Sequence, residues 1–272
     1  MSRIRSRFER LRAEGRKAFV AFVSAGDPVG RGDAASRPLD SAIERTVDIA
    51  LALEAGGTDV LELGVPFSDP LADGPVIQRS SERALRRGVT LAAVLEAVAQ
   101  IRARGCALPI VLFSYYNPLL AYGLERLCRD ASAAGVDGAL VTDLPPEEAG
   151  EWLPHARAAG LDTIFLAAPT SPEARLQRVC AASRGFVYAV SRTGVTGERA
   201  ALSDEAGPLV ARVREHTSVA VVLGFGLSTP EQVAAAAEVA DGAVVGSALV
   251  RFLEEHPEGD VAEQVRWLKS RM

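Results

Sequence analysis

The chain has 272 residues, of which 48% are hydrophobic and 24% charged, and its formal net charge is −5. This composition supports a large apolar core, whereas the negative charge argues against nucleic acid and anionic membrane surfaces as partners. No apolar run reaches the roughly 18 residues that a membrane-spanning helix needs.

The first predicted element is a short amphipathic helix. In residues 1–17, MSRIRSRFERLRAEGRK, arginine and glutamate are interspersed, and Ile4, Phe8 and Leu11 recur at helical spacing. The segment lacks the apolar centre of a signal peptide.

The number and spacing of the cysteines indicate the redox environment of the protein. The chain has three cysteines, Cys106, Cys128 and Cys180, and no CxxC pair. An odd number of widely separated cysteines gives no complete disulfide framework. We therefore expect a reduced, cytoplasmic protein.

An apolar run, a turn and a helix-forming stretch recur eight times along the chain. The predicted strands cover residues 18–28, 59–66, 109–118, 138–145, 161–169, 185–191, 219–226 and 242–250. The predicted helices lie near residues 41–55, 76–103, 119–134, 147–159, 173–183, 204–216, 230–239 and 248–270. Continuously apolar strands that alternate with helices indicate right-handed βαβ units around a parallel sheet.

Eight such units predict a closed (β/α)8 TIM barrel with a short extra N-terminal helix, forming one domain over residues 1–272. The alternative is an open doubly wound sheet, whose nucleotide-binding form is disfavoured because no GxGxxG motif follows the first strand. Residues 29–41 are rich in Gly, Pro, Asp and Ser and predict a long loop. Residues 191–199, SRTGVTGER, predict a lid with Gly194 and Gly197 as hinges; the alternative is a plain surface loop.

The residue types at the strand ends limit the possible chemistry, because active sites of this fold lie there. The only two lysines, Lys17 and Lys269, lie near the chain ends, which argues against a Schiff-base aldolase. The three histidines fall in or near predicted helices, which argues against a histidine-bound metal and a Ser-His-Asp triad. Carboxylate, tyrosine and backbone groups remain, and we expect no catalytic metal.

Glu62 is the most informative of these residues. It interrupts the apolar run 59–66, and period-two alternation places Val60, Glu62 and Gly64 on one strand face. Gly64 would leave space around the carboxylate. Burial raises the pKa of a carboxyl group toward neutrality, which suits a general acid or base. The alternative is a structural glutamate bonded to a neighbouring strand.

Asp73 and Asp69 follow Glu62 in a turn-rich segment. Asp73 precedes Gly74, and Asp-Gly is a strong turn signal, so the residue is either a functional carboxylate or a turn or cap residue. The same alternatives hold for Asp69, which precedes a proline. The spacing alone leaves both questions open.

Two glycine-containing strand ends predict a phosphate site. Residues 224–226 read Gly-Phe-Gly, and Gly246-Ser247 ends the eighth run. Glycines allow a phosphate to approach backbone N–H groups, and a helix N-terminus favours the anion. The loops after strands 7 and 8 are the usual phosphate site of a TIM barrel. The alternative is that these glycines only form tight turns.

Six motifs together carry a family resemblance. They are FVSAGDP, ELGVPFSDPLADGP, SYYNP, SRTGVTG, GFGLS and GSALV, in this order along the chain. With them, the chain from about Phe8 to its last helix closely resembles the tryptophan synthase α subunits. The resemblance implies a TIM barrel that cleaves indole-3-glycerol phosphate to indole and glyceraldehyde 3-phosphate, a retro-aldol reaction without a cofactor in this chain.

The resemblance also assigns residues. Glu62 corresponds to the catalytic glutamate, Asp73 to the aspartate that bonds the indole N–H, and Tyr188 to a tyrosine beside them. The phosphate-binding positions correspond to Gly197, Gly226, Gly246 and Ser247, and the apolar positions around the indole to Phe22, Phe113 and Phe225.

The family implies a partner, a β subunit that holds pyridoxal phosphate and uses the indole, in an αββα heterotetramer. Ser68, Asp69 and Pro70, together with Asn117 and Pro118, would face this subunit. The chain departs from the family pattern in its longer segment 29–41 and at Phe113, which would shape the indole pocket differently.

Two other functions remain possible at this point. The first is another phosphate-binding barrel of aromatic amino-acid synthesis, such as an isomerase, which would leave the Glu62–Asp73 segment unexplained. The second is a silent barrel that only activates a partner, against which the presence of both carboxylates argues.

Overall fold

The computed structural model describes residues 2–27, 39–190, 204–224 and 226–272. Eight parallel strands form a closed barrel in the order β1 to β8, with β1 hydrogen-bonded to both β2 and β8. The strands are β1 (Ala18–Ser24), β2 (Val60–Gly64), β3 (Ile110–Ser114), β4 (Gly138–Val141), β5 (Asp162–Ala167), β6 (Phe186–Val190), β7 (Ala220–Gly224) and β8 (Gly242–Val245). The predicted TIM barrel is confirmed, and the open-sheet alternative is wrong.

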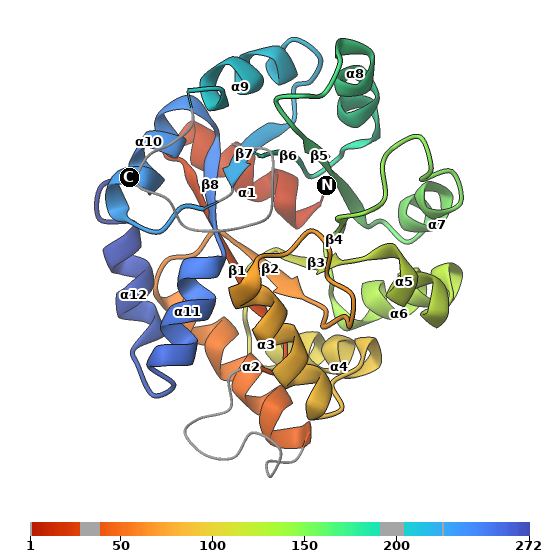
Figure 1. Ribbon diagram of the computed structural model, residues 1–272, viewed down its shortest axis with the longest axis vertical. Helices are drawn as coiled ribbons and strands as arrows, with labels where there is room; N and C mark the ends of the chain where they lie inside the picture. Colours follow the sequence, from red (N-terminus) through yellow and green to blue (C-terminus); the bar gives the residue numbers. More distant parts are fainter. Residues whose placement is uncertain (1, 28–38, 191–203, 225) are drawn as a thin grey trace.

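Helices surround the barrel (Figure 1). Those in the described part of the chain are α1 (Arg3–Ala13), α2 (Leu39–Ala55), α3 (Pro75–Arg86), α4 (Leu91–Ala103), α5 (Tyr116–Tyr122), α6 (Leu124–Ala134), α7 (Trp152–Ala158), α8 (Glu173–Ala182), α9 (Ala206–Arg214), α10 (Pro230–Val239), α11 (Ser247–Glu255) and α12 (Val261–Leu268). None of these helices is both long and apolar enough to cross a membrane.

Side chains alternate between the barrel interior and the helix layer, as the period-two pattern predicts. On β2, Val60 belongs to the interior cluster, whereas Leu61 and Leu63 pack in the cluster shared with the helices. The strand register places Glu62 opposite Phe22 of β1 and Val111 of β3. Glu62 is therefore directed into the barrel rather than toward the helices.

The predicted N-terminal helix is confirmed as α1. Its buried residues Ile4, Phe8 and Leu11 belong to the interior cluster, and Phe8 contacts Phe186 at a ring-centroid distance of 5.8 Å. A Cβ added at Gly138, the first residue of β4, would lie 3.0 Å from Ile4. The helix thus covers the amino ends of the strands, and the carboxyl ends remain for the site.

Three predicted helices are each two helices in the structure. The stretch 76–103 divides into α3 and α4 because Gly88 adopts a positive φ of 79°, which favours glycine, and Thr90 caps α4. The stretch 119–134 divides at Gly123, with φ 91°. The stretch 248–270 divides into α11 and α12, and Asp260 caps α12.

Some predicted boundaries were wrong. The runs 109–118 and 242–250 end as helix, because α5 begins at Tyr116 and α11 at Ser247. Helix α2 already begins at Leu39, inside the predicted loop 29–41. The rest of that loop and the predicted lid 191–199 lie outside the described residues.

Candidate active site

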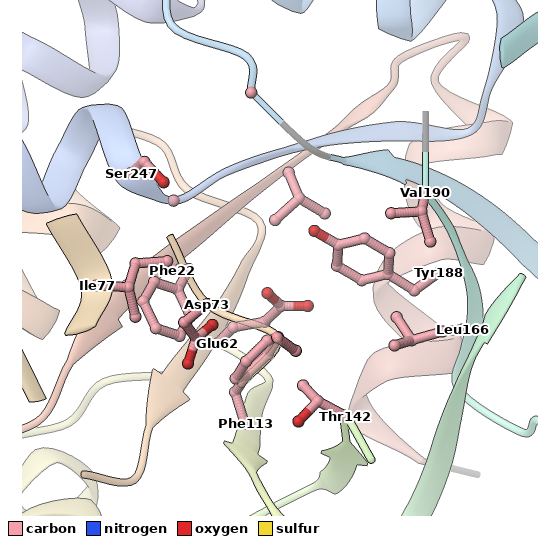
Figure 2. A pocket seen from close by; sticks show the side chains of 14 residues that line it. Phe22, Glu62, Asp73, Ile77, Phe113, Thr142, Leu166, Tyr188, Val190 and Ser247 are labelled. Carbon is pink, nitrogen blue, oxygen red and sulfur yellow. The ribbon is translucent and has the colours of Figure 1, made fainter. Parts of the chain in front are cut away.

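A cavity opens at the carboxyl ends of the strands (Figure 2). About 610 Å³ of space lies between its walls, including the part that is open to solvent. The lining residues are Phe22, Glu62, Ala72, Asp73, Ile77, Phe113, Thr142, Leu166, Tyr188, Val190, Gly226, Val244, Gly246 and Ser247. The sequence predicted eight of these fourteen.

Glu62 lies in the wall of this cavity and is fully buried, with 0% exposure. Neither of its carboxylate oxygens has a hydrogen-bond partner among the described residues, so the alternative of a structural bond to a neighbouring strand finds no support there. Burial raises the pKa of Glu62 from 4.5 to about 8. The group is therefore a protonated acid at neutral pH that can give up its proton to a bound molecule.

Asp73 lies in the segment between β2 and α3 and is 5% exposed. The hydroxyl of Tyr115 donates to Asp73 Oδ2 at 3.0 Å, while helix α3 has Gly74 as its N-cap. The Asp73 backbone does take part in a turn, since its N–H donates to the Pro70 carbonyl at 3.0 Å. Its carboxylate, however, faces the cavity (Figure 2), so the turn and the site coexist.

The two carboxyl groups differ in ionisation. Burial raises the pKa of Asp73 from 3.8 to about 6, and the Tyr115 hydrogen bond acts against this rise. At neutral pH Asp73 is therefore mostly ionised, whereas Glu62 is mostly protonated. Two carboxyl groups with separated pKa values in one cavity can perform different steps of one reaction.

Tyr188 projects from β6 into the cavity (Figure 2). Its ring lies against Gly224 of β7, where an added Cβ would stand 2.2 Å from the hydroxyl oxygen, so only glycine fits there. Burial, followed by the negative charges of Glu62 and Asp73, raises the pKa of Tyr188 well above its ordinary value. Tyr188 is therefore a neutral phenol beside both carboxyl groups.

Two phenylalanine side chains form an aromatic part of the cavity wall. Phe22 and Phe113 meet edge to face, with ring centroids 5.0 Å apart at 72°. The expectation that Gly64 leaves open space beside Glu62 was wrong, because a Cβ there would lie 2.7 Å from the Phe22 ring. The space at Gly64 is filled by the aromatic ring that forms the pocket wall.

The ends of β7 and β8 bring backbone groups to the cavity. Gly226, with a φ of 82°, and Gly246 line the cavity, and Ser247 begins the nine-residue helix α11. The N-terminus of α11 at the cavity provides N–H groups and a favourable dipole for an anion. Two residues predicted for the site, Gly197 and Phe225, lie outside the described residues.

The residues predicted to face a partner lie in the segments that follow β2 and β3. Ser68 and Asp69 are exposed, and with Pro70 they line a surface groove next to Leu71, which is 86% exposed. Asn117 and Pro118 occupy the first turn of α5.

The sequence did not single out Ala72, Ile77, Thr142, Leu166, Val190 or Val244 for the site. Thr142 was recognisable as a polar residue at a strand end. The others are apolar residues of a kind that fills every strand and helix of this fold, so their types carry no signal.

One possible metal-binding group appears among the described residues, formed by Glu173, Glu215 and His216. It does not line the cavity, and Glu173 is already paired with His216 and with Arg212, at 3.1 Å from the latter. We assign it no role in the site.

Comparison with known proteins places the chain in a family. The family model described as the tryptophan synthase alpha chain matches residues 8–271. The tryptophan synthase alpha chain of Geobacter sulfurreducens is 51% identical over 265 residues, covering 97% of this chain and 95% of that protein. That of Roseiflexus sp. is 49% identical and covers 99% of both chains.

Solved structures of the same family are also similar to this chain. The tryptophan synthase subunit alpha of Legionella pneumophila superposes with a TM-score of 0.85 at 33% identity, covering 100% of this chain and 97% of that one. A chain of Mycobacterium tuberculosis tryptophan synthase superposes with a TM-score of 0.86 at 39% identity, covering 99% and 98%. The chain therefore belongs to the tryptophan synthase alpha chain family.

Proposed function

We propose that this cavity is where the chain cleaves indole-3-glycerol phosphate into indole and glyceraldehyde 3-phosphate, with Glu62 and Asp73 as its catalytic carboxyl groups. The observation that carries the proposal is the pair itself. Glu62 is a buried acid without a partner among the described residues, and Asp73 is an ionisable carboxylate in the same cavity. No lysine or histidine is among the described residues that line the cavity, and we assign the proton transfers to the two carboxyl groups.

Glu62 would act first as an acid. Its proton moves to the ring carbon that bears the side chain, and the ring nitrogen becomes a positively charged iminium. The ionised Glu62 then accepts the proton of the side-chain hydroxyl next to the ring. The carbon–carbon bond breaks, its electron pair returns to the ring to form indole, and the carbon that loses it becomes the aldehyde. Glu62 ends protonated, so the cycle is balanced without water.

Asp73 would bind the indole N–H and stabilise the positive charge that appears on the nitrogen, which is electrostatic stabilisation of the transition state. Tyr188 would pack beside both groups as a neutral phenol. The edge-to-face pair of Phe22 and Phe113 would hold the ring plane, and Phe225 is proposed for the same pocket from the family pattern.

The substrate phosphate would bind where β7 and β8 end. Gly246 and Ser247 supply the N-terminus of α11 there, and Gly226 lies in the segment after β7. Gly197 is proposed for this site from the family pattern alone. An unphosphorylated indole glycerol should consequently bind far more weakly than the natural substrate.

The chain's partner would be a tryptophan synthase β subunit in an αββα assembly, and pyridoxal phosphate would belong to that subunit. The groove at Ser68, Asp69 and Pro70 and the first turn of α5 at Asn117 and Pro118 are the proposed contact surface. The three buried free thiols, Cys106, Cys128 and Cys180, suit a reducing cytoplasm.

Indole release from indole-3-glycerol phosphate tests the proposal directly. The purified chain should release indole slowly alone and faster when a cognate β subunit is added. Unphosphorylated indole glycerol serves as the control for the phosphate site. Absence of indole in both conditions would contradict the assigned reaction, and equal rates would contradict the proposed activation by the partner.

A further inference from the structure

We infer that Tyr115 is a positioning residue for the cleavage reaction: its hydroxyl fixes the orientation of the Asp73 carboxylate and holds it in the ionised form. The inference rests on the proposed function of Asp73 and assigns a role to a residue that does not line the main cavity. Tyr115 follows β3, is the N-cap residue of α5 and is 4% exposed.

The direction of the hydrogen bond is set by a third group. The backbone N–H of Ala72 donates to the Tyr115 hydroxyl oxygen at 3.0 Å. A hydroxyl has one hydrogen to donate, and Asp73 Oδ2, at 3.0 Å, is its charged acceptor. Because Tyr115 accepts from Ala72, its hydrogen is directed at the carboxylate, an arrangement that stabilises the ionised form of Asp73.

The tyrosine ring is itself fixed. It packs against Phe67, with ring centroids 5.2 Å apart. Phe67 is held in turn by Ser81 of α3, whose hydroxyl accepts from the Phe67 N–H at 2.8 Å and donates to its carbonyl at 3.0 Å. The hydroxyl of Tyr115 therefore occupies one position relative to the segment that carries Asp73.

The hydrogen bond from Tyr115 opposes the effect of burial on the pKa of Asp73. Burial raises the pKa of the Asp73 carboxyl, and the Tyr115 hydrogen bond lowers it, to give a value of about 6. Glu62 on β2 and Tyr188 on β6 are the other titratable groups that line the cavity among the described residues, and both are neutral at pH 7. On α3, Arg79 and Arg83 are paired with Glu254, and Arg83 also with Asp27. Among the described residues, Tyr115 is thus the side chain whose hydrogen bond favours the Asp73 charge.

Tyr115→Phe tests the inference, because it removes the hydroxyl and keeps the ring that packs on Phe67. The side-chain carboxyl of Asp73 would be titrated by 13C NMR in the free protein, where no substrate is needed. We expect its midpoint to rise by about one pH unit, as for the loss of one hydrogen bond to a charged group. The acid limb of kcat/KM should move by the same amount, so that kcat/KM falls about fivefold at pH 6 and less than twofold at pH 8.

Tyr122→Phe is the matched control. Tyr122 donates to Asp130 at 2.9 Å, the same kind of bond on α5, but neither residue lines the cavity. This variant should leave the Asp73 titration and the pH profile unchanged. A second variant, 3,5-difluorotyrosine at position 115, has a more acidic hydroxyl and should move the Asp73 midpoint down, so the inference remains testable if Tyr115→Phe folds poorly.

The outcomes distinguish a failure of the role inferred for Tyr115 from a failure of the function proposed for Asp73. An Asp73 midpoint that stays fixed in Tyr115→Phe, or in the fluorinated variant, overturns the inference. A midpoint that moves without any movement of the acid limb of kcat/KM refutes the proposed role of Asp73 in cleavage, and with it the catalytic part of the inference. Both movements together support the inference.

Discussion

Glu62→Gln is expected to lower kcat for indole release by about 10³-fold, because glutamine keeps the shape of the side chain but cannot donate a proton. General acid and base catalysis by one positioned group typically contributes about 10²–10⁴-fold. Glu62 is proposed to donate one proton as an acid and then to accept another as a base. The KM should change little, since the proposed contacts of the phosphate and the indole ring are with other residues. Steady-state kinetics over the same substrate range for both proteins provide the comparison.

The same substitution is expected to stabilise the fold at neutral pH. The pKa of Glu62 is raised to about 8 in the folded protein from an ordinary 4.5. Glu62 therefore contributes fully to the free energy of unfolding below pH 4.5, where it is protonated in both the folded and the unfolded chain. This contribution is lost as the pH rises from 4.5 to about 8, because over that range the unfolded chain releases the proton while the folded protein keeps it. At pH 7 the loss amounts to about 3 kcal/mol, for 2.5 units at 1.36 kcal/mol each.

Denaturant unfolding of both proteins at pH 5 and pH 7 measures this effect. The stability difference between Glu62→Gln and the wild type should grow in favour of the variant between these two pH values. An inactive variant with that stability profile has lost chemistry rather than structure. A variant that retains more than a tenth of the wild-type kcat would refute the assigned role of Glu62.

Asp73→Asn is expected to lower kcat by about 10²-fold, because asparagine cannot balance the positive charge that forms on the indole nitrogen. Removing one electrostatic group from a transition state typically costs about 10²–10³-fold in kcat. The acid limb of the pH profile should disappear in the variant, since we assign this limb to the ionisation of Asp73, whose pKa is about 6.

Asp73→Asn also carries its own control. The amide can still accept the Tyr115 hydroxyl, so the segment 67–73 should keep its position and thermal unfolding should change little. If kcat falls while an acid limb near pH 6 remains, that limb arises from another group, and the role given to Asp73 is wrong.

The barrel could be predicted from the sequence because each of its units repeats the same local pattern. The direction of Glu62 followed from strand periodicity alone, since a one-residue shift would have placed it among the helices. The breaks at Gly88 and Gly123 were missed because the flanking stretches both favour helix, whereas the structure separates them at glycines with positive φ.

The contacts across the barrel could not be predicted in this way. The space at Gly64 is decided by Phe22, which becomes a neighbour only through the register of β1 and β2. The bond between Tyr115 and Asp73 joins residues 42 positions apart, and nothing in their local sequence indicates it. The apolar lining residues Leu166 and Val244 have no distinguishing type at all.

The pH dependence of kcat/KM for indole release by the wild-type chain tests the central claim most directly, that two carboxyl groups act in opposite protonation states. The rate should rise as Asp73 ionises above about pH 6 and fall as Glu62 loses its proton above about pH 8. Unphosphorylated indole glycerol should give the same two limbs, which separates them from ionisation of the substrate phosphate near pH 6. A rate that is independent of pH from 5 to 9, or that keeps rising above pH 8, would contradict the account.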